Sequence, residues 1–297
     1  MNSLALVGST PTLSRLYGAV PSIDGADVGV SGAARALVVL EDRAVPYLSQ
    51  KLELFYPKHI AEQLIRKDTM PKLLGRYGFP ELKTVRVKRV DDIKLNNFIL
   101  KPVFGSACGS WVAVNQSVAY KKFDDPTHLE DTLAGSPDIK WFVAQEAVMA
   151  DAHTTASVAG TVNQNGDVLF IRPTLSYWRN GVRYKSVRSF AFQELYTTQE
   201  LLREFIASAG IRCAAFSLQL ILKDEVFYPM DWNFHLPAPY VMDATRLQRE
   251  EFDAAVHHMM GYTARFDLPT DKWVINRSEA TNALHVDAYM ANKVAIE

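Results

Sequence analysis

Residues 212–235 combine the pattern of a β-hairpin with three side chains that carry coordinating oxygens. Two apolar, β-prone runs on either side of a polar turn at 223–225 predict two paired strands. Gln219 lies in the middle of the first run, and Asp231 and Asn233 lie at the end of the second. Because Asp231 and Asn233 are two residues apart, they point the same way from an extended strand. Such oxygens suit Mg²⁺, although the same pattern also fits a plain hairpin with a capping Gln and a turn.

A lysine within an apolar run and a loop of small residues predict contacts with phosphate groups. Lys101 interrupts the run 98–103, and a lysine inside a buried strand needs an anionic partner because an unpaired buried charge is costly. The loop 104–110 that follows contains Gly105, Ser106 and Gly109. Small residues let backbone N–H groups close on phosphate oxygens. The loop lacks the Gly-Lys-Ser/Thr of a P-loop, so it is a different kind of phosphate loop.

The remaining pattern predicts the elements that must position these residues. Helices are expected at 57–66, at 69–78 and at 199–209, each with apolar residues on one face. Strands are expected at 83–89, 98–103, 141–149, 154–161, 168–177 and 182–192, and Asn-Gly turns separate the last three. Short buried strands are expected at 4–7 and 36–40 and a closing helix at 242–260.

Basic residues gather on the predicted antiparallel sheet: Arg172, Arg179, Arg183, Lys185 and Arg188. Strand alternation predicts that Arg183 and Lys185 share one face. Two interpretations stay open for this surface. It is either a solvated sheet face or a cationic cradle for a phosphate and an anionic substrate.

Composition places the chain among globular cytoplasmic proteins. Of its 297 residues, 48% are hydrophobic and 22% are charged, and the formal net charge of −1 argues against a non-specific nucleic-acid binder. The two cysteines, Cys108 and Cys213, form no disulfide framework and suit a reducing compartment. There is no basic signal-peptide region and no apolar run long enough for a membrane span, so no membrane partner is expected.

Several segments resemble ATP-grasp enzymes of the carboxylate–amine ligase type, in the order in which that family carries them, across residues 67–235. Lys67, followed by Gly78-Phe79-Pro80, resembles the helix and turn that open the fold. Residues 99–102 and 105–109 resemble the nucleotide lysine and its flap, and residues 142–148 are similar to the adenine-binding hinge. Gln219 followed by Asp231-x-Asn233 resembles the magnesium site.

The resemblance implies an α/β (α+β) chain with the ATP-grasp fold, in which two α+β subdomains grip ATP. The expected domains are a shortened N-terminal α/β region at 1–66, a subdomain with the flap at 67–144, and a subdomain with the metal hairpin at 145–297. ATP would contact Lys67, Lys101, Gly105, Ser106, Gly109, Gln145, Glu146, Val148 and His153. Mg²⁺, or Mn²⁺ in its place, would bind Gln219, Asp231 and Asn233, and Arg172, Lys185 and Arg188 would act on the substrate.

Three positions depart from the family pattern and leave three functions open. His153 stands where a ribose-binding Glu is usual, Asp231 where the metal site usually has Glu, and His235 where Arg is usual. The first hypothesis is a ligase that joins a small-molecule carboxylate to an amine through an acyl-phosphate. The second is a kinase that phosphorylates a hydroxyl, and the third is a non-catalytic nucleotide-binding protein. A homodimer is compatible with each.

Overall fold

The computed structural model describes most of residues 56–236 and short pieces on either side. The described residues are 56–88, 92–93, 95, 98–103, 142–148, 152–179, 182–189 and 191–236, together with 3–7, 22–23, 34–39, 254–255, 257–259 and 273–276. The predicted flap with Gly105, Ser106 and Gly109 lies outside the described residues, and so does most of the helix predicted at 242–260.

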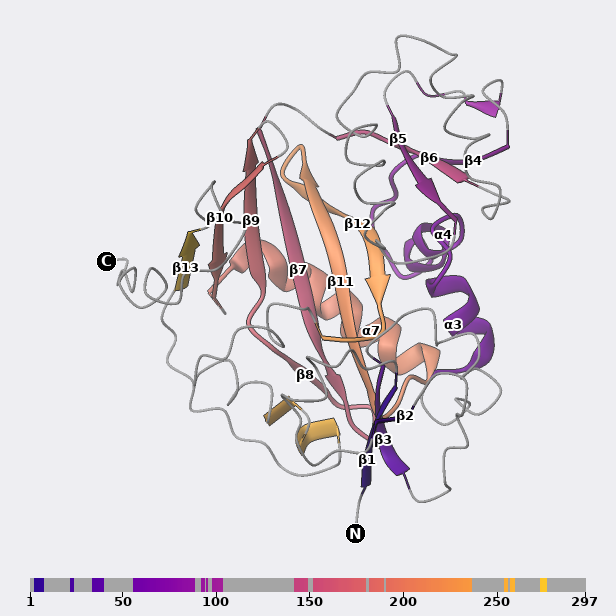
Figure 1. Cartoon of the computed structure of the whole chain (residues 1–297), viewed down its shortest axis with the longest axis vertical. Coiled ribbons are helices and arrows are strands. Elements are labelled where there is room, and N and C mark those ends of the chain that lie inside the picture. Colours follow the sequence, from indigo (N-terminus) through magenta and orange to yellow (C-terminus); the bar gives the residue numbers. More distant parts are fainter. Residues whose placement is uncertain are drawn as a thin grey trace.

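A large antiparallel sheet forms the centre of the described structure (Figure 1). Its strand order is β12-β11-β7-β9-β10-β13, and β8 pairs with β7. The strands are β7 (Ala152–Val162), β8 (Val168–Phe170), β9 (Thr174–Arg179), β10 (Val182–Arg188), β11 (Ala214–Lys223), β12 (Val226–Asn233) and β13 (Trp273–Asn276). The hairpin predicted within residues 212–235 is therefore confirmed as β11 and β12.

The strand predicted at 168–177 is wrong in one respect, because the structure divides it into β8 and β9. The break coincides with Pro173, which has no N–H to donate to a strand neighbour. Here the backbone makes irregular bonds: Ile171 N donates to Ala159 O, and Ser189 N donates to Pro173 O. The segment before β9 consequently lies beside the end of β10.

Two helices and a second sheet lie beyond the β12 edge of the large sheet (Figure 1). Helices α3 (Lys58–Leu64) and α4 (Met70–Gly75) match the two predicted near the start of the fold. The small antiparallel sheet has the order β4-β6-β5, with β4 (Thr84–Val87), β5 (Phe98–Pro102) and β6 (Phe142–Glu146). Strand β6 ends at Glu146, two residues beyond the domain boundary expected at 144.

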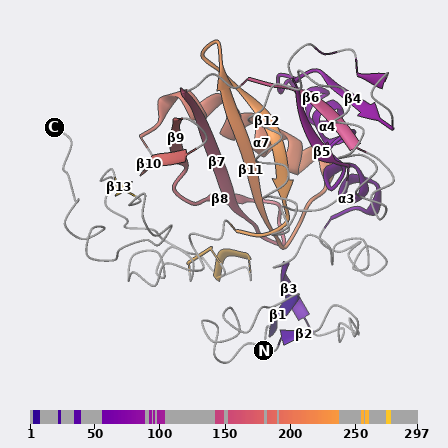
Figure 2. The ribbon, with the colours of Figure 1, turned by 45° about the horizontal axis from the view of Figure 1, so that its top comes forward.

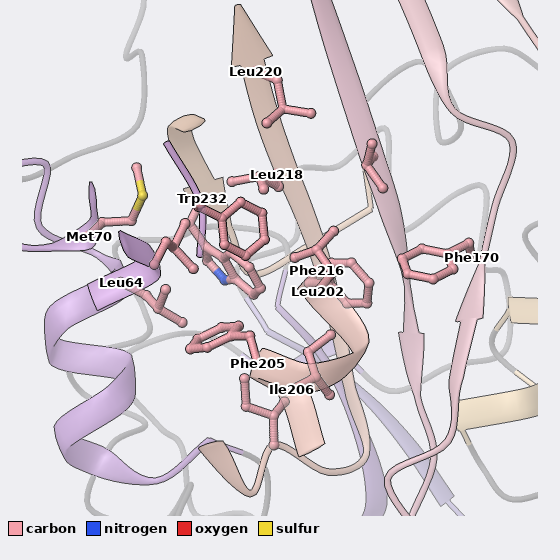
Figure 3. Close-up of a cluster of buried hydrophobic side chains, with 14 of the residues drawn as sticks. Leu64, Met70, Phe170, Leu202, Phe205, Ile206, Phe216, Leu218, Leu220 and Trp232 are labelled. Atoms are coloured by element: carbon pink, nitrogen blue, oxygen red, sulfur yellow. The ribbon is translucent and has the colours of Figure 1, made fainter. Parts of the chain in front are cut away.

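One face of the large sheet is covered by helix α7 (Tyr196–Ala209). Phe205 packs edge-on against Trp232, which stacks on Phe216, and Leu64 and Met70 contribute to the same buried cluster from α3 and α4 (Figure 3). This core joins the first helices to the hairpin, so the side chains that alternate with it on β7, β11 and β12 point to the opposite face.

The N-terminal strands β1 (Ser3–Val7), β2 (Ser22–Ile23) and β3 (Ala34–Val39) form a separate parallel sheet in the order β2-β1-β3. The strands predicted at 4–7 and 36–40 are thus confirmed. Figure 2 shows this sheet below the large one, where β3 contacts β11. None of the helices in the described part of the chain is long and apolar enough to cross a membrane.

A β-bulge in β10 overturns the expectation that Arg183 and Lys185 share one face. Arg183 pairs with Trp178, whereas Lys185 pairs with Tyr177, and the register shifts between them. Because Trp178 and Tyr177 are neighbours on β9, their partners lie on opposite faces. Lys185 consequently lies on the face that packs against α7, with its ammonium 5.5 Å from the centre of the Tyr177 ring.

Candidate active site

A row of polar side chains crosses the face of the large sheet that lies opposite α7. The register pairs Arg188 with Thr174, Thr174 with Ser157, Ser157 with Gln219, and Gln219 with Asp231. Directly paired residues share a face, so all five project to the same side. Four strand spacings separate the two ends of the row, a distance of about 19 Å. The row therefore has the Arg188 cation at one end and the Asp231 carboxylate at the other.

The three predicted metal ligands lie together at the Asp231 end of the row. Gln219 is exposed while its neighbours Leu218 and Leu220 are buried in the core, which confirms its direction. Asn233 is paired with Ser217, and its Nδ2 donates to Ser217 O at 3.4 Å. This leaves the amide oxygen of Asn233 available as an acceptor. One carboxylate and two amide groups on one face form a donor set that fits a hard divalent cation.

Lys67 is held between α3 and α4 and reaches the carboxylate of Asp231. Its backbone N–H donates to Val103 O at 3.0 Å, which ties the connection to the end of β5. Beside it, Arg66 donates two hydrogen bonds to Asp68, at 3.0 and 2.7 Å. Lys67 Nζ lies 3.2 Å from Asp231 Oδ1, and the two side chains are 11% and 25% exposed. The small fraction exposed to solvent strengthens this pair relative to a surface ion pair.

Lys101 brings a second ammonium group to the same place from β5. Its Nζ donates to Gln145 Oε1 at 2.9 Å, and Gln145 Nε2 donates to Thr84 Oγ1 at 3.3 Å. Burial lowers the pKa of Lys101 to about 8 from 10.5, while the Asp231 carboxylate opposes the shift and Lys67 adds to it. Lys67, Lys101 and Asp231 thus form a single electrostatic group, called here the lysine–aspartate group.

The end of β6 is linked to the hairpin by an ion pair that sequence reasoning missed. Lys223 Nζ lies 2.7 Å from Glu146 Oε1. The hydrogen bond from Lys223 lowers the pKa of Glu146. Lys223 follows Gln219 by four residues on the same face of β11, about 13 Å along the strand. That even spacing was the available signal, but the sequence was interpreted as placing Lys223 in a solvated turn.

His153 lies near this end of the sheet and is part of an aromatic stack. Its ring is 5.8 Å from that of Trp178, with the two planes 6° apart. The guanidinium of Arg183 lies 5.6 Å from the centre of the Trp178 ring, and Trp178 Nε1 donates to Thr155 Oγ1 at 2.8 Å. The stack fixes the His153 ring against the sheet.

The arginines predicted to act on the substrate lie near one another. Arg188 is 3% exposed and ends β10, and Arg172 is 4% exposed and precedes β9. The bond from Ser189 N to Pro173 O brings these two chain segments side by side. Lys185, on the opposite face of the sheet, is not brought to the site. The structure therefore places the chain segments of Arg172 and Arg188 side by side and leaves their role a prediction.

Comparison with known proteins rests on solved structures, since no family model and no curated protein matches the sequence. N5-carboxyaminoimidazole synthetase from Staphylococcus aureus, complexed with ADP, superposes with a TM-score of 0.65 at 12% identity, over 98% of this chain and 86% of that one. L-amino acid ligase from Bacillus licheniformis gives 0.61 at 12% identity, over 93% and 79%. N5-carboxyaminoimidazole synthase from Aspergillus clavatus, in complex with ADP and aminoimidazole ribonucleotide, gives 0.62 at 10% identity, over 93% and 81%.

These three structures are ATP-grasp enzymes. The chain has the ATP-grasp fold. The fold class expected from the sequence is confirmed. Within this fold the lysine–aspartate group combines Lys101 from the small sheet, Asp231 from the large sheet, and Lys67 from the connection between α3 and α4. At such low identity the likeness establishes the fold and does not establish the reaction.

No cluster of three or more His, Cys, Asp or Glu side chains suited to a metal occurs within the described residues. The hairpin set contains a single carboxylate, Asp231, with the amides of Gln219 and Asn233. Such a set with one negative charge depends on phosphate oxygens to complete the coordination of Mg²⁺.

Proposed function

We propose that the chain is an ATP-dependent ligase that joins a carboxylate to an amine through an acyl-phosphate intermediate. The observation that carries this proposal is the lysine–aspartate group, at which elements of both halves of the fold meet. Two ammonium groups beside one carboxylate leave a net positive charge, which attracts a polyphosphate. The ligases of the same fold, among them structures complexed with ADP, support the choice of ATP and of this reaction class.

In this proposal the nucleotide lies along the hairpin, between its two ion pairs. Its base lies along residues 146–148 at the end of β6, where backbone groups bind the adenine edge, and its phosphates lie at Lys67 and Lys101. Lys223 and Gln219 mark these two positions on β11, about 13 Å apart. An extended nucleoside triphosphate covers such a span. His153, beside the base end, makes the contact to the ribose.

Gln219, Asp231 and Asn233 would hold Mg²⁺ or Mn²⁺, which would offset the negative charge that develops on the phosphate oxygens. The Asp231 carboxylate is also paired with Lys67, at 3.2 Å. When the nucleotide binds, the Lys67 ammonium turns to a phosphate oxygen and frees the Asp231 carboxylate. Exchange of one partner for another keeps each of these charges paired, which avoids the cost of an isolated charge in a partly buried site.

The chain's residues position the reactants for two substitutions. A carboxylate oxygen of the substrate attacks the γ-phosphorus, and the bond to the ADP oxygen breaks. The amine then attacks the carbonyl carbon of the acyl-phosphate, loses a proton and expels orthophosphate. Lys67 and Lys101 stabilise the transferring phosphoryl group, and Arg172 and Arg188 orient the acid from the Arg188 end of the row. Exclusion of water matters because an acyl-phosphate hydrolyses readily.

The deciding experiment is calorimetric titration with the non-hydrolysable analogue AMP-PNP, with and without Mg²⁺. Wild-type protein binds AMP-PNP more tightly with Mg²⁺, and Lys67→Met weakens binding by roughly tenfold or more, as expected for a lost hydrogen bond to a charged group. Lys58→Met is the matched control, since Lys58 is an exposed helix residue paired only at 3.9 Å with Glu62. Absence of AMP-PNP binding in both conditions would contradict the proposal.

Product analysis then separates the ligase from the other two functions considered. With ATP and mixtures of acids and amines, the ligase releases orthophosphate and ADP and forms an amide. A kinase would form ADP with a phosphorylated acceptor and no orthophosphate. A non-catalytic protein would bind AMP-PNP without turning over ATP.

A further inference from the structure

Lys223 belongs to a tight and unusual turn at the tip of the β11–β12 hairpin. Lys223 pairs with Val226, so only Asp224 and Glu225 connect the strands. Both adopt positive φ angles, 49° and 62°. Hairpin turns of this kind favour Asn and Gly, because other side chains are strained at positive φ. A strained turn is retained where the surrounding structure needs its geometry, and here that geometry sets the position of Lys223.

The Lys223 ammonium reaches from this turn to a different sheet. It meets Glu146 at 2.7 Å, across 77 residues of sequence, and Glu146 is the last residue of β6. The backbone of Glu146 is fixed as well, because its N–H donates to Lys83 O at 2.8 Å. The contact therefore ties the end of the small sheet, and the segment 146–148 that follows it, to the large sheet.

The two ion pairs on the hairpin respond differently to nucleotide binding: one has to open, whereas the other can stay closed. At the phosphate end the cation is Lys67 and the hairpin supplies the anion, Asp231. At the other end the hairpin supplies the cation, Lys223, and the small sheet supplies the anion, Glu146. The first pair has to open so that Lys67 meets phosphate. The second pair involves neither a phosphate ligand nor a metal ligand, so it can persist while the first exchanges its partners.

We propose that Lys223 is a positioning residue that holds the base-binding segment 146–148 against the large sheet through Glu146, without touching the nucleotide itself. This inference rests on the proposed function, since it presumes that an adenine nucleotide lies along segment 146–148. It assigns the Glu146 side chain to the link between the sheets and leaves only the backbone of this segment to bind the base. Loss of the link therefore weakens recognition of the base and leaves recognition of the phosphates unchanged.

The experiment compares two ligands in calorimetric titrations: AMP-PNP, which carries the base, and inorganic tripolyphosphate, which does not. Lys223→Gln and Glu146→Gln are each expected to weaken AMP-PNP binding about fivefold, the upper range for a partly exposed ion pair, and to leave tripolyphosphate binding unchanged. The double variant is expected to be no weaker than either single variant, because both remove the same contact. Lys223→Arg, which keeps the charge, restores most of the affinity for AMP-PNP.

The control is Arg203→Gln, which removes a more exposed ion pair, with Glu200 on α7, and should change neither titration. Three results would overturn the inference: unchanged AMP-PNP affinity in Lys223→Gln, an equal loss for tripolyphosphate, or additive effects in the double variant. In each of these cases the wild type still binds AMP-PNP and the proposed function stands. If wild-type protein binds tripolyphosphate but not AMP-PNP, or binds neither, the proposed function fails as well.

Discussion

At the scale of single residues, the site depends on charges held close together with limited access to water. Lys67 and Lys101 approach the same carboxylate from different elements, and the pKa of Lys101 falls to about 8 because burial disfavours its charged form. The unfolded chain keeps this proton to about pH 10.5, so this group's contribution to folding stability becomes more favourable as pH rises from 8 to 10.5. Over the same pH range the attraction of Lys101 for phosphate weakens, because the side chain loses its positive charge.

Affinity for AMP-PNP is therefore expected to fall as pH rises through about 8, where Lys101 loses its positive charge. If the neutral amine contributes nothing, the fall approaches about tenfold per pH unit above the pKa. Lys101→Arg keeps its charge at every pH tested and should remove this part of the dependence. Titrations between pH 6.5 and about 9.5 check this, and an identical pH profile in Lys101→Arg would exclude Lys101 as the titrating group.

Asp231→Asn is expected to abolish the effect of Mg²⁺ on AMP-PNP affinity, because it removes the one carboxylate of the metal set. Orthophosphate release should fall by roughly a hundredfold or more, as when a transition state loses its main electrostatic partner. The exchange is close to isosteric, so the midpoint of urea unfolding should change little. Undiminished turnover in Asp231→Asn would place the metal elsewhere.

At the scale of elements, the bulge in β10 decides which basic residues reach the site. Strand alternation alone would place Arg183 and Lys185 on one face of the sheet. The extra residue Tyr184 instead moves every later side chain of β10 to the face opposite the one that alternation predicts. Arg188 consequently lies in the polar row. Lys185 lies over Tyr177, on the face of the sheet that packs against α7. A single inserted residue therefore separates two cations that the sequence pattern groups together.

Arg188→Gln is expected to lower ligase turnover by at least about tenfold through weaker binding of the acid, whereas Lys185→Gln should leave turnover within about twofold of wild type. Both variants should bind AMP-PNP normally, because Arg188 lies about 19 Å from Asp231 along the row. Steady-state kinetics with varied acid concentration provides the measurement. A larger loss in Lys185→Gln than in Arg188→Gln would show that the face assignment does not govern function.

At the scale of the whole molecule, one core supports both the hairpin and the helices that carry Lys67. Phe205 and Leu202 of α7 lie under Trp232 and Phe216, and Leu64 of α3 belongs to the same cluster (Figure 3). Through this core Lys67 is placed opposite Asp231, which no local feature of either segment specifies.

Phe205→Ala is expected to lower the free energy of unfolding by about 3–5 kcal/mol, since it removes a fully buried aromatic ring from this core. Glu204→Ala, at the neighbouring exposed position, should change it by less than about 0.5 kcal/mol. Chemical denaturation followed by tryptophan fluorescence measures both. Equal small changes in the two variants would show that α7 is not part of the main cooperative core.

The sequence by itself determined much of the local structure and the kind of chemistry. Apolar alternation and turn residues define the hairpin, the helices before it and the antiparallel strands, because these signals depend on neighbours within a few residues. The ordered resemblance of short motifs indicated the ATP-grasp fold, which the superposed structures bear out. The choice of Lys67 and Lys101 as nucleotide-binding residues and of Asp231 as a metal ligand also came from the sequence, and their roles stay predictions.

Only the tertiary structure decided which of these residues meet. The ion pairs Lys67–Asp231 and Glu146–Lys223 join residues that are 164 and 77 positions apart, and no local pattern encodes their contact. The bulge in β10 likewise depends on how β10 pairs with β9. Long-range pairing is set by the burial of a shared core, which is a property of the folded chain and of no single segment.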